Sequence, residues 1–197
     1  MADMEATAEL GPEQLQSARD VIASAGVVVI DGNLGREALE HALDLSGGVR
    51  TIFEPVSVPK AAGLKDALDG RVHAVTPNRD ELAALTDLPT RTDKQVRTAA
   101  GALHRRGIEL VWIRLGDRGS LLSSGDGVVE IPAVPTTVED VTGAGDAMLA
   151  AFCHVLLDGG TPEQAARFGH AAAALTIASP HTVRPDLTPQ LIKKALS

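Results

Sequence analysis

One short segment combines residue types that are suited to chemistry on a phosphate group. It reads Asp140-Val141-Thr142-Gly143-Ala144-Gly145-Asp146-Ala147 and leads into an apolar stretch that we expect to be helical. The first N–H groups of a helix have no intrahelical acceptor and lie at the positive end of its dipole. We therefore expect the amides of Gly143, Ala144 and Gly145 to form an anion hole. Asp146, in the first turn, would act as a general base toward an attacking hydroxyl.

An ordinary glycine-rich loop is the alternative interpretation of this segment, with Asp146 only complementing the helix dipole. Met148 stands where a dinucleotide-binding fingerprint would have its third glycine, and no GxxxxGK[ST] phosphate loop occurs in the chain. The segment alone therefore leaves the catalytic and the structural interpretation open.

Two further segments contain residues that suit a nucleotide site. Asn78 and Glu81, in Thr76-Pro77-Asn78-Arg79-Asp80-Glu81, come directly after a predicted strand. By themselves they also fit a helix cap and a solvated first-turn acid. Gly116 and Gly119, in Leu115-Gly116-Asp117-Arg118-Gly119, follow another predicted strand, and by themselves they also fit a turn between strands.

In this order the three segments resemble the signatures of the ribokinase-like (PfkB) family of carbohydrate and nucleoside kinases. The resemblance runs over essentially the whole chain but covers only the larger, C-terminal part of the family fold. It implies an ATP-dependent kinase that transfers the γ-phosphate to a hydroxyl of a sugar or nucleoside, with Asp146 as its catalytic base. Asn78 and Glu81 would organise Mg²⁺ and its waters near the phosphates, which suits a hard cation.

The resemblance also implies roles for other matched positions. Gly116 and Gly119 would let the backbone lie against the nucleotide. Arg114 stands where relatives often have Thr or Ser, and we expect it to reach a phosphate instead. Asp140 and Thr142 match positions that help to hold a monovalent cation such as K⁺ in some members.

One histidine of the C-terminal helices also matches a family position. His170 lies where these helices approach the adenine in the family, which implies a contact with the nucleotide. A packed or exposed helix histidine is the alternative.

A fourth segment points to an acceptor. Glu54-Pro55-Val56-Ser57-Val58-Pro59-Lys60-Ala61 resembles the Asp-Pro-Val-Ser-x-x-Lys-Ala segment of the pseudouridine kinase subgroup, and Asp3-Met4 and Asp31-Gly32-Asn33-Leu34 fit the same subgroup. The implied acceptor is the 5′-hydroxyl of pseudouridine, with ribokinase-like sugar phosphorylation as the alternative. Lys60 would meet a phosphate or the base, or be a solvated lysine. Asp31 and Asn33 would bind the acceptor at a strand's carboxyl end, or only cap the next helix.

The elements that must position these residues alternate between strand and helix. Short apolar, β-branched runs bounded by Gly or Pro predict strands, and longer periodic stretches predict helices. The pattern predicts an α/β fold with a doubly wound, mostly parallel sheet flanked by helices, and its loops after the strands lie at one edge. The predicted strands are 26–31, 49–54, 72–76, 109–115, 120–124 and 128–131; the predicted helices are 11–25, 35–45, 59–68, 80–85, 93–106, 143–157, 162–178 and 188–196.

Composition narrows the class of protein further. A formal net charge of −8 disfavours a nucleic-acid partner, and 44% apolar residues suffice for a sizeable core. Cys153 is the only cysteine, so no intramolecular disulfide forms, and a reducing compartment, the cytoplasm, is expected. No apolar run approaches a membrane span.

The N-terminal part of the chain is unusual for this family. Nothing in it matches the family's first strands, its β lid or its Gly-Gly segment that grips the sugar. We expect residues 1–197 to be one domain, the C-terminal portion of the family fold, present as a fragment, a product of a mis-set start codon or a shortened protein. A non-catalytic nucleotide-binding remnant is the alternative function. Lost strands would leave an apolar sheet edge open, which favours self-association as a homodimer.

Overall fold

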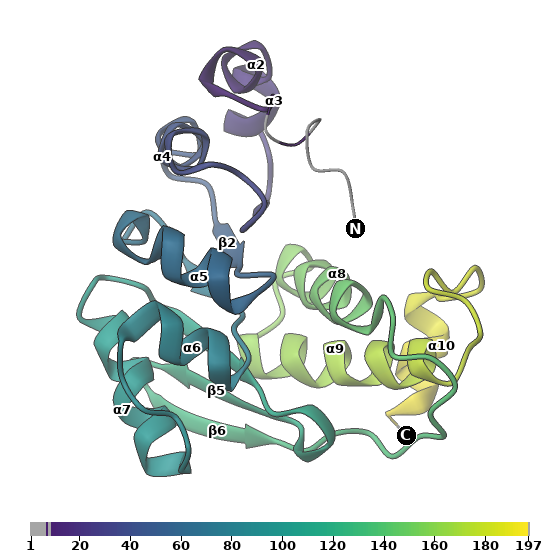
Figure 1. The fold of residues 1–197 in the computed structure, drawn as a ribbon. Coiled ribbons are helices and arrows are strands. Elements are labelled where there is room, and N and C mark those ends of the chain that lie inside the picture. The colour runs from purple at the N-terminus through teal and green to yellow at the C-terminus, as the bar shows by residue number, and fades with distance from the viewer. Residues whose placement is uncertain (1–6, 8, 197) are drawn as a thin grey trace. The chain divides into compact units, whose positions relative to one another are not determined.

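The computed structural model describes residue 7 and residues 9–196, so the Asp3-Met4 segment lies outside the described residues. The chain divides into two compact units, Met1–Arg114 with Ser123–Val128 and Leu115–Leu122 with Val129–Ser197. Figure 1 shows the path of the chain through both units. The predicted alternation of strands and helices is confirmed.

The first unit contains the parallel strands. Their order in the sheet follows the sequence, and β1 pairs with β2, β2 with β3 and β3 with β4, all parallel. Figure 1 shows the connecting helices stacked in sequence order. The elements are α2 (Pro12–Ser17), α3 (Arg19–Ala23), β1 (Val28–Asp31), α4 (Arg36–Leu45), β2 (Thr51–Glu54), α5 (Val58–Leu64), the 3₁₀ turn η1 (Lys65–Ala67), β3 (Ala74–Val75), α6 (Arg79–Thr86), α7 (Asp93–His104) and β4 (Leu110–Arg114).

The helix expected over residues 11–25 is two short helices, which corrects the prediction. The Ser17 hydroxyl donates to the Gln14 carbonyl at 2.6 Å, and the Ala18 N–H bonds to the Leu15 carbonyl at 3.0 Å. Serine side chains that bond to nearby backbone compete with the regular helical pattern. The helix therefore ends at Ser17 and a new one begins at Arg19.

Strands β2, β3 and β4 form the centre of the first unit. Ile52, Phe53 and Val111 have no exposed surface, as expected for parallel strands that are covered on both faces. β1 is the first strand in the sheet order, and its Val29 is 46% exposed. An open sheet edge and a homodimer formed at it both remain predictions.

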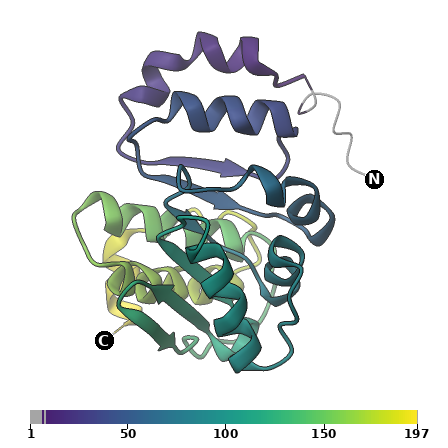
Figure 2. The ribbon, with the colours of Figure 1, turned by 90° about the vertical axis from the view of Figure 1, so that its left-hand side faces the viewer.

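The second unit is built on packed helices. Its elements are the 3₁₀ turn η2 (Gly116–Arg118), α8 (Ala144–Leu157), α9 (Pro162–Ile177) and α10 (Pro189–Ala195), while the hairpin strands β5 (Ser120–Ser124) and β6 (Gly127–Ile131) contribute residues to both units. Alanines on α9 allow α8 to approach closely, and the two helices lie side by side in both views (Figures 1 and 2). The core shared by α8, α9 and α10 contains Ala151, Phe168, Ala171, Ala172 and Ile192. None of the described helices has both the length and the apolar character to cross a membrane.

Candidate active site

The glycine-rich turn before α8 is built around a backbone position that only glycine fits. Gly143 has φ +78° and forms the N-cap of α8. A Cβ at this position would lie 2.0 Å from the carbonyl oxygen of Thr182. Both the left-handed conformation and this close approach exclude any larger residue without a backbone shift. The sequence pattern therefore reflects a real packing requirement of the second unit.

Of the three amides expected to form an anion hole, those of Gly143, Ala144 and Gly145, one is engaged within the turn, and anion binding by the others remains a prediction. The Ala144 N–H donates to the Val141 carbonyl at 3.3 Å within the turn. First-turn amides lack intrahelical acceptors, so Gly145 and Asp146 are placed where their N–H groups can meet an anion. The side chain of Asp146 belongs to the first turn of α8, and the residue is exposed. A carboxylate in this position is accessible to an acceptor hydroxyl.

Asp140 and Thr142 form a local hydrogen-bonded pair just before this turn. Asp140 Oδ1 accepts bonds from the Thr142 backbone N–H at 2.8 Å and from the Thr142 hydroxyl at 2.7 Å. These two donors, the backbone N–H first, lower the pKa of the Asp140 carboxyl. The carboxylate thus stays charged and oriented, which suits a cation. The K⁺ role of this pair remains a prediction.

The two glycines of the Leu115–Gly119 turn have different surroundings. Gly119 has φ +89°, and a Cβ there would lie 2.0 Å from the Ile131 carbonyl oxygen, so the chain itself requires this glycine. Gly116 has φ +65° and nothing within 4 Å of a Cβ. A side chain at this position would therefore meet open space, and contact of Gly116 with a nucleotide remains a prediction. The turn is closed by a bond from the Gly119 N–H to the Gly116 carbonyl at 3.1 Å.

His170 is packed inside the second unit. It is 6% exposed, and its Nε2 lies 2.8 Å from the Ser120 hydroxyl. This geometry favours the alternative of a packed helix histidine, and a contact with adenine remains a prediction. Burial lowers the pKa of His170 to about 4.

The low pKa of His170 predicts a stability that depends on pH. The folded chain keeps His170 neutral down to about pH 4, whereas the unfolded chain takes up a proton below about pH 6.5. The contribution of neutral His170 to the free energy of unfolding is complete above pH 6.5. It is lost as the pH falls toward 4, by about 1.4 kcal/mol per pH unit. Urea unfolding across this window should show a smaller pH slope for His170→Gln than for the wild type. Equal slopes would contradict this assignment.

The first unit gathers a charged network at the carboxyl ends of its strands. Arg114, the last residue of β4, donates through Nη2 to Glu54 Oε1 at 2.6 Å and to Glu81 Oε2 at 3.3 Å. Glu54 ends β2 and also accepts a bond from the Thr76 hydroxyl. The predicted phosphate contact of Arg114 is not tested by these bonds. The sequence analysis did not predict this ion pair, although Glu54 and Arg114 are both charged residues at the ends of predicted strands.

Asn78 and Glu81 together cap helix α6. Asn78 Oδ1 accepts from the N–H groups of Asp80 and Glu81, both at 2.9 Å, and Glu81 Oε2 accepts from the Asn78 N–H at 2.8 Å. Glu81 is only 3% exposed. The interpretation of Asn78 as a helix cap therefore holds, whereas Glu81 is buried and is not the solvated first-turn acid that the sequence suggested. A metal role of either residue remains a prediction. Among the described residues no group of three or more His, Cys, Asp or Glu side chains is arranged to hold a metal ion.

The three predicted substrate residues lie together in the first unit. Asp31 accepts from the Asn33 backbone N–H and from its side-chain Nδ2, both at 2.9 Å, and Lys60 Nζ donates to Asn33 Oδ1. The loop after β1 packs closely against the loop after β2, since a Cβ at Gly32 would lie 2.4 Å from the Pro55 carbonyl oxygen. The structure thus brings these residues into one cluster, while contact with a substrate remains a prediction.

The loop after β2 contains a strained residue. Val56 has φ +68°, and the Ser57 N–H bonds to the Pro55 carbonyl at 2.8 Å, which makes a γ-turn of the rare form with positive φ. A left-handed conformation costs an L-residue about 1–2 kcal/mol, and a β-branched side chain rarely adopts it. Such strain is concentrated at functional sites.

Relief of this strain is a testable expectation. Val56→Gly should raise the free energy of unfolding by about 0.5–1 kcal/mol, because removed strain outweighs the added flexibility of the unfolded chain. The control is Val58→Gly, at a similarly exposed position that begins α5, which should lower this free energy by up to about 1 kcal/mol. Urea unfolding of both variants measures the contrast. A decrease in both would show that Val56 is not strained.

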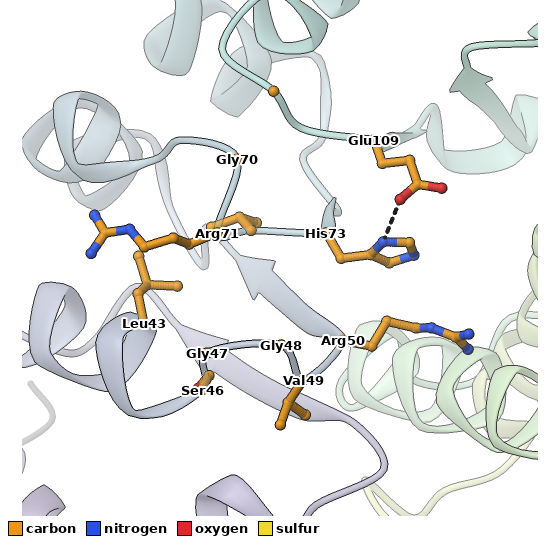
Figure 3. Close-up of a pocket in the computed structure, with 12 residues that line it drawn as sticks. Leu43, Ser46, Gly47, Gly48, Val49, Arg50, Gly70, Arg71, His73 and Glu109 are labelled. Atoms are coloured by element: carbon orange, nitrogen blue, oxygen red, sulfur yellow. Dashed lines mark ion pairs between the residues drawn. The ribbon is translucent and has the colours of Figure 1, made fainter.

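A cavity of about 560 Å³ lies elsewhere in the first unit (Figure 3). Arg50, His73 and Glu109 line it, and each directly precedes a strand. The cavity is therefore at the amino ends of the strands, opposite the edge with Glu54 and Arg114. His73 Nδ1 and Glu109 Oε2 are 2.9 Å apart and Arg71 pairs with aspartates, so these wall charges are compensated. None of the residues predicted from sequence to act on a ligand lines this cavity.

The fold and the motif order define the class of protein. Ribokinase from Thermotoga maritima superposes with a TM-score of 0.84 at 25% identity, over 96% of this chain and 62% of that chain. Ribokinase from Arabidopsis thaliana complexed with ribose and ATP gives a TM-score of 0.79 at 26% identity, over 91% and 58%. The chain is thus a ribokinase-like α/β protein.

Sequence comparison then gives the family. The pfkB family carbohydrate kinase model matches residues 1–189, so the chain belongs to the pfkB family. The uncharacterized sugar kinase YeiI of Escherichia coli strain K12 is 33% identical over 91% of this chain and 50% of its own length. The pseudouridine kinase of the same organism is 30% identical over 94% and 59%. The chain therefore spans between half and three-fifths of the length of these curated relatives.

Proposed function

We propose that this chain carries out ATP-dependent phosphoryl transfer to a hydroxyl group of a sugar or nucleoside. The observation that carries the proposal is the turn before α8, where a crowded Gly143 and an exposed Asp146 stand at a helix start. Membership of the pfkB family supports the same reaction class. ATP loses its γ-phosphoryl group to the acceptor oxygen, ADP leaves, and the acceptor proton passes to Asp146.

In this proposal each residue of the turn has a distinct task. Asp146 accepts the proton of the attacking hydroxyl as the oxygen bonds to the γ-phosphorus. The amides at the start of α8 stabilise negative charge on the transferring group, which is the main protein contribution in phosphoryl transfer. Gly116 leaves open space for the nucleotide, and Asp140 with Thr142 holds a monovalent cation.

The residues fit a Mg²⁺ ion that is bound through water. Glu81 and Asn78 offer oxygen atoms, the ligands that this cation prefers. Glu81 Oε2 already accepts from Arg114 and from a backbone N–H, so direct ligation by this oxygen competes with both donors. We assign Asn78 and Glu81 to the waters of the ion, which supplies charge neutralisation to the phosphates.

The acceptor that we propose first is the 5′-hydroxyl of pseudouridine. Support comes from the Glu54–Ala61 segment, from the cluster of Asp31, Asn33 and Lys60, and from similarity to a pseudouridine kinase. Ribose is the second candidate, because ribokinases are also similar to this chain. The relatives have different substrate names. Their similarity to this chain therefore supports a small-molecule acceptor in general more strongly than it supports any one substrate.

The test is acceptor-dependent ADP release by the purified chain with ATP, Mg²⁺ and K⁺. Pseudouridine, uridine, ribose and a no-acceptor control are compared at equal concentration. Release that depends on pseudouridine alone supports the finer proposal, and release with ribose alone supports a sugar kinase. ADP binding with no acceptor-dependent release would instead indicate a nucleotide-binding protein without turnover.

A further inference from the structure

Two acidic side chains lie against one guanidinium at the carboxyl edge of the first unit's sheet. Both bonds leave the same atom, Nη2 of Arg114, at 2.6 Å to Glu54 Oε1 and 3.3 Å to Glu81 Oε2. The two carboxylate oxygens can therefore be no farther apart than the sum of these distances. The side chains of Arg114, Glu54 and Glu81 are 22%, 14% and 4% exposed, so water screens their charges only weakly.

The other donors to these carboxylates are neutral. Glu54 accepts from the hydroxyl of Thr76, and Glu81 from the backbone N–H of Asn78. Within the part of the chain that the structure describes, Arg114 is the only positively charged partner of these two carboxylates. Its removal would leave two poorly solvated carboxylates close together, and oxygen ligands of this kind attract a small divalent cation.

We propose that Arg114 is a positioning residue whose guanidinium takes the place of a divalent cation between Glu54 and Glu81. The nucleotide-free chain then has no need of Mg²⁺ at this edge, and the ion is bound only together with the phosphates of a nucleotide. The consequence for turnover rests on the proposed function. The counter-ion role itself does not, and it can be measured without ATP or an acceptor.

A second arginine in the same unit provides a matched comparison. Arg71 bonds to Asp44 through Nη1 at 2.5 Å and to Asp69 through Nη2 at 3.0 Å, so it also joins two carboxylates. These side chains are far more exposed, at 38%, 66% and 51%. Loss of Arg71 leaves carboxylates that water can solvate, and no metal site is expected there.

The experiment is a calorimetric titration of the nucleotide-free chain with Mg²⁺ and with Mn²⁺. The wild type should show no saturable binding in the micromolar range. Arg114→Gln should gain a site with a dissociation constant at least about tenfold lower than any binding by the wild type, as expected for a pair of carboxylates. Arg114→Lys keeps the charge and should behave as the wild type. Arg71→Gln should gain no site.

Three results would overturn the proposal. They are micromolar binding by the nucleotide-free wild type, binding by Arg114→Gln no tighter than that of the wild type, and an equal gain in Arg71→Gln. If Arg114→Gln is insoluble, it is refolded from urea with and without Mg²⁺. Recovery only with Mg²⁺ supports the proposal, and no recovery overturns it. The titration gives the same information for a chain without kinase activity. Failure of this proposal can therefore be distinguished from failure of the proposed function.

Discussion

Asp146→Asn is expected to lower kcat by about 10²–10⁴-fold and to leave ADP binding nearly unchanged. The asparagine keeps the size and position of the side chain but cannot accept a proton. Asp146 is exposed in the first turn of α8, so it has no packing role in the second unit that the substitution would disturb. Steady-state ADP release gives kcat, and calorimetry with ADP gives the affinity.

The control for this variant lies at the other end of the same helix. Asp158 caps the C-terminus of α8, and its side chain is 74% exposed. Asp158→Asn makes the same chemical change and should retain the turnover of the wild type. Unchanged turnover in Asp146→Asn would remove Asp146 from the role of base.

Gly143→Ala is expected to produce a large loss of both stability and nucleotide affinity. Its Cβ would lie 2.0 Å from the Thr182 carbonyl oxygen and 2.9 Å from the carbonyl carbon, so the backbone must shift. The positive φ adds a conformational cost of about 1–2 kcal/mol. We expect the free energy of unfolding to fall by about 3 kcal/mol or more. Affinity for ADP should fall at least tenfold, because the shifted turn moves the amides.

Gly159→Ala separates the crowding from the conformational cost. Gly159 has φ +79°, almost the same as Gly143, but nothing lies within 4 Å of a Cβ there. This variant should lose only about 1–2 kcal/mol and should bind ADP as the wild type does. Urea unfolding and calorimetry on both variants give the comparison. Equal losses of stability would show that contact with Thr182 contributes nothing.

Elements that depend on local pattern were predictable from the sequence. Buried strands such as β2 and β4 are short β-branched or apolar runs, and the helices α7 and α9 begin at Thr caps. The break at Ala18 was not predictable from periodicity, and a hydroxyl bond from Ser17 accompanies it. The alternation of strands and helices predicted parallel pairing, whereas the order of the strands in the sheet was not predicted.

The candidate site was predictable where a motif depends on adjacent residues. The capping pair of Asn78 and Glu81 lies within one short segment, whereas the crowding of Gly143 comes from Thr182, which is distant in the sequence. The bond between Arg114 and Glu54 joins residues 60 positions apart, which no spacing rule predicts. The positive φ of Val56 was also hidden, because valine disfavours that conformation and only the surrounding loop enforces it.

The most direct test of the account follows the phosphorus atom itself. The purified chain is incubated with ATP, Mg²⁺, K⁺ and pseudouridine, and phosphorus NMR follows the γ-phosphoryl group. The account predicts a new phosphomonoester signal on the acceptor that grows with ADP and is nearly abolished in Asp146→Asn. If ATP remained intact, or if phosphate appeared only as the free ion at a rate independent of acceptor, the assignment of phosphoryl transfer to this chain would be contradicted.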